Sequence, residues 1–332
     1  RLVAIANRTL SQAQRAYREA GAADPVVVKG VRELESAISE GRHAVTEDPM
    51  LLCEAGNIDA VIEATGEIEF GAAVVLKAIG HGKHVVLMNA ELDATVGPIL
   101  KVRADRAGVV ITNTDGDEPG VAMNLFRFVK TIGMRPVLAG NLKGMIDPYR
   151  TPETQREFAE RNRQKPVMIT SFADGTKLSM ELTVLANATG FRVARRGMFG
   201  HKCAHVKDAL KLFPLELFRD GGLVDYVLGA EPHTGAFVMG LEENPIRRQY
   251  LDYFKMGDGP LYVFYTPYHL PHVQIPTTVA RAVLFGDATV APQGKPVCSV
   301  LTVAKRDLKK GETLDGIGGF TCYGVIDNAG TA

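Results

Sequence analysis

Apolar and polar positions follow a repeating pattern over the first 140 residues, in which short apolar runs alternate with longer amphipathic segments. Apolar runs separated by helices are typical of a parallel sheet that is covered on both faces. We therefore predict an α/β fold built on a Rossmann-like, doubly wound parallel sheet. The expected strands are 3–6, 43–46, 59–64, 84–88 and 109–112, and the expected helices are 10–20, 32–40, 49–55, 70–80 and 96–107.

The opening strand resembles the second strand of a dinucleotide-binding domain, because a basic residue follows it. A first strand with its Gly-x-Gly-x-x-Gly loop would normally precede it, and that loop is absent here. We therefore expect the nucleotide domain to be truncated, with a first βα unit of roughly 20–30 residues outside this chain. The alternative is a complete protein with an unusual sheet.

The pattern changes after residue 136, where an α+β substrate domain is expected. A strand at 137–140 leads into a polar segment, and 154–163 is predicted to be a charged, solvated helix. We predict a hairpin with strands at 167–173 and 176–180, turning at Asp174-Gly175, because glycine suits such turns. Further expected elements are a helix at 181–188, a strand at 261–265 and a helix at 277–285 that returns to the first domain.

Composition bears on the partners and the cellular location that can be expected for this chain. The net charge is zero at pH 7, with 38 basic and 38 acidic residues, so no excess of positive charge indicates a nucleic acid or a membrane surface as partner. No apolar run approaches the roughly 18 residues of a membrane span. The four cysteines are far apart and form no Cys-x-x-Cys motif, which favours a reducing, cytoplasmic location.

The residues that follow the first, third and fourth predicted strands are the candidate cofactor contacts. In dinucleotide-binding sheets, an acid after the second strand selects the ribose diol, and a basic residue there pairs with a 2′-phosphate. Arg8 stands at this position, so we predict NADP(H); the alternative is a solvated strand end. The full set is Asn7, Arg8, Thr9, Ala64, Thr65, Gly66, Asn89 and Glu91.

Three acidic residues cluster where the last strand of this half gives way to a helix, in the sequence "TDGDEPG". Asp115, Asp117 and Glu118 could together hold a divalent cation, Mg²⁺ or Mn²⁺, that polarises a substrate carbonyl. The alternative is a capped helix whose first-turn acids complement its dipole. Asp117 and Glu118 are also catalytic candidates.

Two further side chains are candidates for catalysis. Lys143 follows a strand at the domain junction and could donate to a carbonyl oxygen; the alternative is a surface lysine. His269 lies between prolines in "TPYHLPHVQIP", a rigid loop suited to proton transfer; the alternative is a buried, hydrogen-bonded histidine. Glu181 and Asn187 need not share a face, and either could be structural.

Five segments carry a family resemblance: "IDAVIEATG", "GKHVVLMNAELDATVGP", "TDGDEPG", "LANATG" and "PYHLPHVQIPTTVARAVLFG". Together they resemble homoserine-dehydrogenase-like oxidoreductases with a C-terminal SAF domain, and most closely the 1-deoxy-D-xylulose 5-phosphate reductoisomerase-like group. Two features depart from these patterns. Asn89 is followed by Ala90 rather than lysine, and "NLKGMIDPYRTPET" differs from the reductoisomerase-like stretch.

The resemblance implies four parts of the chain. These are a truncated NAD(P)-binding Rossmann domain (1–136), an α+β substrate and dimerisation domain (137–274), a return helix and linker (275–296) and a partial SAF domain (297–332). It implies an NADP-dependent oxidoreductase that acts on a small polar substrate, which can carry a phosphate, and it implies a homo-oligomer. The alternatives are a reductoisomerase of isoprenoid precursor synthesis and a non-catalytic ligand-binding or sensor protein.

Overall fold

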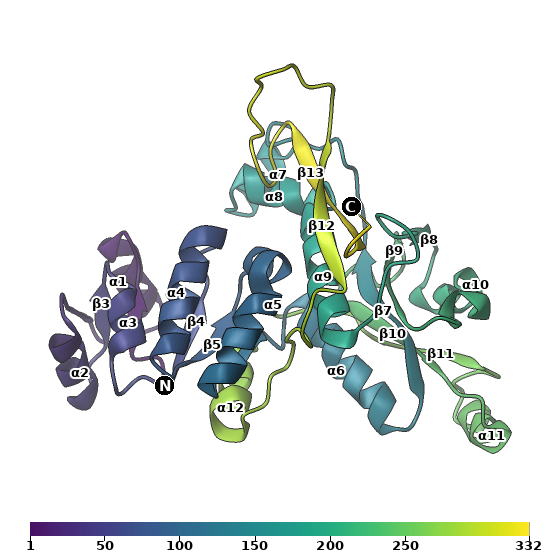
Figure 1. Cartoon of the computed structure of the whole chain (residues 1–332), viewed down its shortest axis with the longest axis horizontal. Helices are drawn as coiled ribbons and strands as arrows, with labels where there is room; N and C mark the ends of the chain where they lie inside the picture. Colours follow the sequence, from purple (N-terminus) through teal and green to yellow (C-terminus); the bar gives the residue numbers. More distant parts are fainter. Residues whose placement is uncertain (332) are drawn as a thin grey trace.

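The computed structural model describes residues 1–331. Its first part consists of strands followed by helices, as the hydrophobic pattern predicts (Figure 1). The first six elements are β1 (Ala4–Ala6), α1 (Leu10–Glu19), β2 (Val26–Val27), α2 (Val31–Ser39), β3 (Ala44–Thr46) and α3 (Met50–Glu54). The next six are β4 (Ala60–Glu63), α4 (Ile68–Gly80), β5 (His84–Leu87), α5 (Ala90–Ala107), β6 (Ile111–Asn113) and α6 (Glu118–Thr131).

The first six strands form two parallel sheets of three strands each. Their orders are β1-β3-β2 and β4-β5-β6. β1 and β4 are edge strands, so the two sheets share no ladder of hydrogen bonds. Val61, Val75, Val85 and Leu100 form one core from β4, α4, β5 and α5, which is how near-continuous apolar strands become covered by helices. The predicted parallel α/β class is confirmed, although the strands form two sheets rather than one.

The second part is built around one mixed five-stranded sheet, in the order β11-β10-β7-β9-β8. The long strand β7 is central; it pairs parallel to β9 and antiparallel to β10. Helices α6 and α9 contact one face, and a second apolar cluster, which includes Phe213 and Phe218, covers the other. The elements are β7 (Arg135–Lys143), α7 (Arg156–Arg161), α8 (Pro166–Ala173), α9 (Thr176–Thr189), β8 (His201–Lys202), η1 (Val206–Asp208), α10 (Ala209–Leu212), η2 (Leu215–Phe218), β9 (Leu223–Leu228), β10 (Ala236–Leu241), α11 (Pro245–Tyr253) and β11 (Leu261–Thr266).

The chain then returns to the first part. Helix α12 (Ile275–Phe285) contacts β5 and β6, as predicted for the return helix. A hairpin of β12 (Cys298–Ala304) and β13 (Cys322–Asn328) packs on α9. Asn187 Oδ1 accepts hydrogen bonds from the backbone of Val297 and Cys298, at 2.7 and 3.1 Å. Asn187 therefore anchors the hairpin, and the proposed SAF boundary at residue 297 does not coincide with a break in the packing.

The predicted hairpin at 167–180 is wrong, because both of its strands are helical. Residues 166–173 form α8, and α9 runs without interruption from Thr176 to Thr189. The β-branched residues Ile169, Thr170 and Thr176 are buried in the helices, where tertiary packing outweighs their preference for strands. Gly175 does lie at a turn, with φ of 87°, but it separates two helices. Strands β9, β10 and β13 and helix α11 were not predicted.

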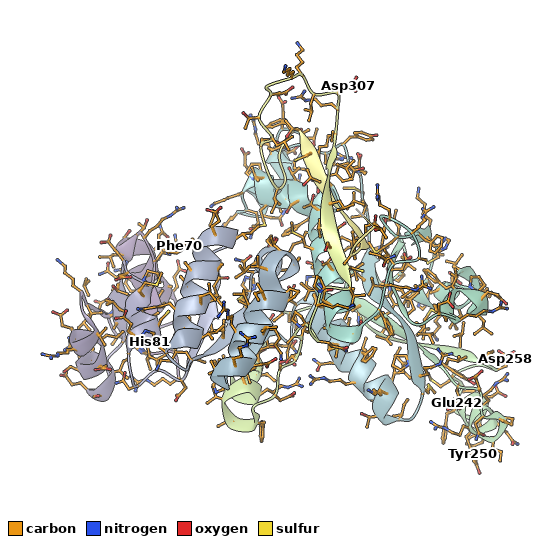
Figure 2. All side chains as sticks on the ribbon, in the orientation of Figure 1. Phe70, His81, Glu242, Tyr250, Asp258 and Asp307 are labelled. Carbon is orange, nitrogen blue, oxygen red and sulfur yellow. The ribbon has the colours of Figure 1, made fainter. Side chains whose placement is uncertain are left out.

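Helix α11 projects from the far end of the second part, where Tyr250 and Asp258 are labelled (Figure 2). None of its residues is buried. Within residues 1–331, no helix is both long enough and apolar enough to cross a membrane.

Candidate active site

Four side chains meet at the carboxyl end of β7, beneath the first turn of α6. Lys143 Nζ forms an ion pair with Glu118 Oε2 and lies 3.5 Å from Glu181 Oε2. Asn141 Nδ2 donates to the same two oxygens, at 2.8 and 3.1 Å. The side chains of Glu118 and Glu181 are only 2% and 5% exposed, so the lysine bridges two buried carboxyl groups. We call these four residues the lysine–carboxylate cluster.

Burial and mutual charge set the protonation of this cluster. Burial would lower the pKa of Lys143, but the facing Glu118 and Glu181 outweigh it, so that the pKa is raised and the lysine stays charged. Burial, together with the charge of Glu118, raises the pKa of Glu181 to about 8, with Lys143 opposing the rise. Burial and then Glu181 raise the pKa of Asp117. At neutral pH the cluster therefore offers a permanent cation beside a carboxyl group that holds a proton.

His269 joins the cluster from the loop between β11 and α12. Its Nδ1 lies 3.7 Å from Glu118 Oε1 and 3.0 Å from Thr234 Oγ1. Burial, followed by the charge of Lys143, lowers the pKa of His269, so the imidazole is neutral at pH 7. The structure thus brings three predicted catalytic residues together: Glu118, Lys143 and His269.

A close backbone approach at Gly116 holds the His269 loop against α6. The Leu270 amide donates to the Gly116 carbonyl at 2.8 Å. A Cβ atom on Gly116 would lie 2.2 Å from the Leu270 carbonyl oxygen and 2.9 Å from Gln274 Oε1. Only glycine fits in this space, so the "DGDEP" turn and the histidine loop are matched in shape.

Lys177 is a second buried lysine at the site, and the sequence interpretation missed it. Its Nζ lies 3.1 Å from Glu91 Oε1, and both side chains are largely buried. Burial would lower the pKa of Lys177, but Glu91, Asp117 and Glu181 raise it. Glu91 therefore faces α9 of the second part, across the junction with the first. The four-residue spacing of Lys177 and Glu181 within one helix was the available signal, and the incorrect hairpin obscured it.

Two of the three acids of the predicted metal site, Asp115 and Glu118 but not Asp117, are paired with other side chains of the protein. The two Asp115 oxygens accept from Arg281 Nη1 at 2.6 Å and Thr289 Oγ1 at 2.8 Å, so Asp115 ties α12 to the first part. Glu118 is occupied by Lys143 and Asn141. Within residues 1–331, no group of three histidine, cysteine or acidic side chains is placed to hold a metal ion. These acids do not fit a divalent cation as arranged.

The predicted cofactor residues lie at the carboxyl ends of β1, β4 and β5. Arg8 is exposed, and Asn7 Oδ1 accepts from the Thr9 amide at 2.8 Å. Ala64, Thr65 and Gly66 form an exposed turn, in which Gly66 has a φ of 72°. The described residues give Arg8 no acidic partner, so its guanidinium suits a 2′-phosphate.

Asn89 and Glu91 differ from the other predicted cofactor residues because both side chains are buried and already paired, Glu91 with Lys177 and Asn89 with two backbone groups. Asn89 Oδ1 caps α5 by accepting from the Leu92 amide at 3.0 Å, and Asn89 Nδ2 donates to the Glu67 carbonyl at 3.0 Å. The Asn89 side chain is fully buried. Asn89 therefore shapes the loop after β5, as an ordinary N-cap residue does.

Comparison with known proteins identifies the class of this site. Residues 116–275, a little under half of the chain, match the family model described as "Oxidoreductase DRL, catalytic domain". The matched segment includes the whole lysine–carboxylate cluster, Lys177 and His269. Residues 116–275 are therefore similar to an oxidoreductase catalytic domain, and this match supports the predicted class and the predicted enzyme. No curated protein matches the chain.

Solved structures similar to this chain include three dehydrogenases or reductoisomerases. A homoserine dehydrogenase from Thiobacillus denitrificans is 26% identical over 55% of this chain and 44% of its own, with a TM-score of 0.34. A probable dehydrogenase from Thermotoga maritima is 14% identical over 85% and 86%, with a TM-score of 0.41. A 1-deoxy-D-xylulose 5-phosphate reductoisomerase from Zymomonas mobilis in complex with NADPH is 14% identical over 89% and 65%, with a TM-score of 0.39. Similarity this low does not bear on the substrate.

Proposed function

We propose that this oxidoreductase transfers a hydride between NADP(H) and a carbonyl or hydroxyl carbon of a small polar substrate. The observation that carries the proposal is the lysine–carboxylate cluster, in which charged Lys143 faces two buried carboxyl groups beside His269. Bound NADPH supplies the hydride. Arg8 would hold its 2′-phosphate, and the 64–66 turn would lie along the nucleotide.

Lys143 is suited to polarising the substrate oxygen rather than to exchanging a proton. Its raised pKa keeps the ammonium charged, and a fixed cation stabilises negative charge that develops on an oxygen. Glu181, whose pKa is about 8, holds a proton at neutral pH and can deliver it to that oxygen. Neutral His269 can accept or relay the proton through Nδ1.

The reductoisomerase alternative receives no specific support from this geometry. As we interpret it, that reaction needs a divalent cation on the acids at 115–118, and two of these acids are paired: Asp115 with Arg281, and Glu118 with Lys143 and Asn141. We also propose that the first part binds the nucleotide, that the second part binds the substrate, and that the protein is a homo-oligomer.

The decisive test replaces Lys143 with an uncharged side chain of similar length. We expect Lys143→Met to lower kcat for carbonyl reduction by about 100-fold or more, since removal of one such donor typically costs 10²–10³. The assay follows NADPH absorbance across a panel of aldehydes, ketones and polyols. Lys202→Met, at an exposed position on β8, is the matched control.

Loss of folding is separated from loss of chemistry by two further measurements. Circular dichroism reports whether Lys143→Met is folded, and Lys143→Arg keeps the charge and should recover part of the rate. Unchanged turnover in folded Lys143→Met would overturn the assignment. NADPH binding without turnover of any substrate by the wild type would favour the non-catalytic binder.

The cofactor assignment has its own test. We expect Arg8→Ala to weaken NADPH binding about tenfold or more and to leave NADH binding unchanged, because only NADPH carries the 2′-phosphate. Fluorescence titrations should use protein that includes any residues preceding Arg1 in its gene. Arg15→Ala, at an exposed position on α1, is the matched control. Equal weakening of both nucleotides would contradict the 2′-phosphate role.

A further inference from the structure

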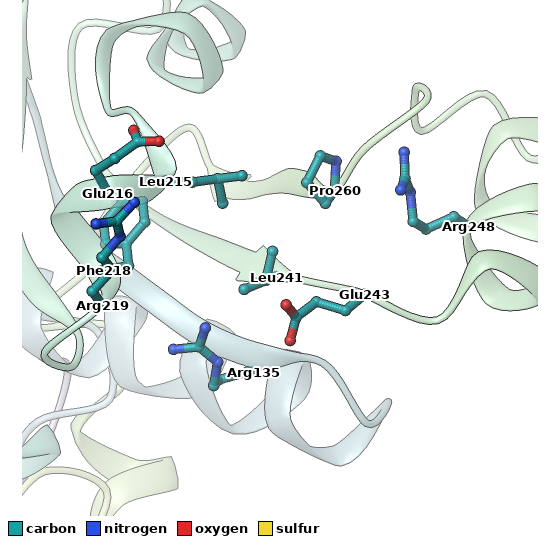
Figure 3. Close-up of a pocket in the computed structure, with 9 residues that line it drawn as sticks. All are labelled: Arg135, Leu215, Glu216, Phe218, Arg219, Leu241, Glu243, Arg248 and Pro260. Atoms are coloured by element: carbon teal, nitrogen blue, oxygen red, sulfur yellow. The ribbon is translucent and has the colours of Figure 1, made fainter.

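A cavity of about 420 Å³ opens at the end of the second part that lies away from the lysine–carboxylate cluster (Figure 3). Small-molecule sites in proteins usually span about 300–1,000 Å³. The cavity lies between η2, the end of β10, the start of β11 and α11. Its walls therefore come from segments far apart in the sequence.

The floor of this cavity is apolar and fixed by the fold. Phe218 is 1% exposed and Leu241 is 6% exposed, and both belong to the core beneath the sheet. Leu215 and Pro260 complete the apolar lining. A ligand that binds here would place an apolar body against Leu215 and Pro260, which rest on the buried Phe218 and Leu241.

Three arginines stand around this floor (Figure 3). Arg248 donates from Nε and Nη2 to the Asp258 carbonyl, at 3.2 and 2.7 Å, which fixes the direction of its guanidinium. Among residues 1–331, neither Arg135 nor Arg219 forms an ion pair. Two guanidinium groups thus line a cavity with their charge uncompensated by a contacting carboxylate.

Two glutamates, Glu216 and Glu243, also line the cavity. With three arginines, they leave a formal excess of one positive charge. This balance favours a ligand with one or two negative charges over a polyanion.

The cavity is separate from the catalytic site. Arg135 is the first residue of β7 and Lys143 is the last. At about 3.3 Å per residue, the two ends of the strand are roughly 26 Å apart. A small ligand in the cavity cannot contact the lysine–carboxylate cluster.

We propose that this cavity binds a small organic oxyanion, with its carboxylate or phosphate held by Arg135 and Arg219 and its apolar body against Leu215 and Pro260. Guanidinium groups match both kinds of oxyanion through paired N–H donors. The site is an addition to the proposed oxidoreductase function and does not depend on it.

Benzoate and phenyl phosphate are suitable probes, because each joins an oxyanion to an apolar ring; benzyl alcohol is the uncharged control. Saturation-transfer NMR and calorimetric titration should show saturable binding of at least one anion. Whichever anion binds identifies the preferred headgroup. We expect Arg135→Gln and Arg219→Gln each to weaken binding about tenfold, and Arg103→Gln, an exposed arginine on α5, to leave it unchanged.

A second set of variants tests whether the anion binds in this cavity. Leu215→Asp, at a 40% exposed position, adds a negative charge to the lining and should abolish binding, whereas Lys143→Met should leave it intact. Three results would overturn the proposal: no saturable binding of either anion, equal binding of benzyl alcohol, or unchanged anion binding in both arginine variants.

Discussion

At the residue scale, the protonation of the buried Asp93 side chain makes the stability of the protein depend on pH. It is 2% exposed, and its Oδ2 accepts from Asn113 Nδ2. Its Oδ1 and the Asn113 Oδ1 have no hydrogen-bond partner within residues 1–331. Burial raises the pKa of Asp93 to about 7, with the Asn113 hydrogen bond opposing the rise. Folding therefore disfavours the charged form of this carboxyl group.

The sign of the pH dependence follows from this raised pKa. The stability associated with protonated Asp93 is fully present below the unfolded value of 3.8 and is lost as pH rises through about 7. We expect Asp93→Asn to stabilise the protein by about 4 kcal/mol at pH 8.5 and to change its stability little near pH 4. Thermal unfolding at a series of pH values measures this change in stability, and Asp105→Asn, at an exposed position, is the control. A gain that does not vary with pH would contradict this account.

At the residue scale, the sequence predicted Glu118, Lys143 and His269 as candidates, and they meet in the structure. It could not predict their pairing, because Glu118 and His269 are brought together only by the tertiary fold. The partners of Asp115, Arg281 and Thr289, could not be predicted for the same reason, because they are more than 160 residues away. A cluster of acids in sequence does not specify where each carboxylate points.

The loop that carries His269 is an element whose position depends on one glycine. A methyl group at Gly116 would collide with the Leu270 carbonyl, so Gly116→Ala must displace the loop or α6. We expect kcat to fall at least tenfold and the free energy of unfolding to fall by about 1–3 kcal/mol. Steady-state kinetics below the melting temperature measures the first effect, and urea unfolding the second.

Gly80→Ala is the matched control for this prediction. No atom lies within 4 Å of a Cβ at Gly80, which ends α4, so we expect no loss of activity. Full activity of Gly116→Ala would show that the loop tolerates displacement and that His269 does not need this position.

At the element scale, the first half was predictable because helices and strands there differ in length and in period. The second half was harder. Short buried segments such as 176–180, in which four of five residues are buried, have no amphipathic period, so a buried helix and a buried strand look alike. The sheet strands β9 and β10 were missed for the same reason: β10 is buried at every position and β9 at most of them.

Across the whole molecule, the ion pair of Glu91 and Lys177 links α5 of the first part to α9 of the second. Removing one partner leaves a buried charge, which typically costs about 3–5 kcal/mol. We expect Glu91→Gln and Lys177→Gln each to destabilise the protein by about this amount, and the double variant to cost less than their sum.

Urea unfolding of the four proteins in this double-mutant cycle measures the coupling. Lys101→Gln and Asp105→Asn form the control cycle, because that pair is within one helix and its aspartate is 60% exposed; its coupling should stay below about 1 kcal/mol. Additive losses at Glu91 and Lys177 would mean that the pair does not hold the two parts together.

The contacts of Asp115 also determine when the enzyme can become active during synthesis. Its side chain and backbone are bound by Thr278, Arg281 and Thr289, and the His269 loop is seated on Gly116. The ribosome must therefore release the chain beyond residue 289 before the first half can complete its site. Long-range contacts of this kind form slowly. A nascent chain halted before α12 would contain the lysine–carboxylate cluster and His269, but it would still lack Thr278, Arg281 and Thr289, which hold Asp115 in place.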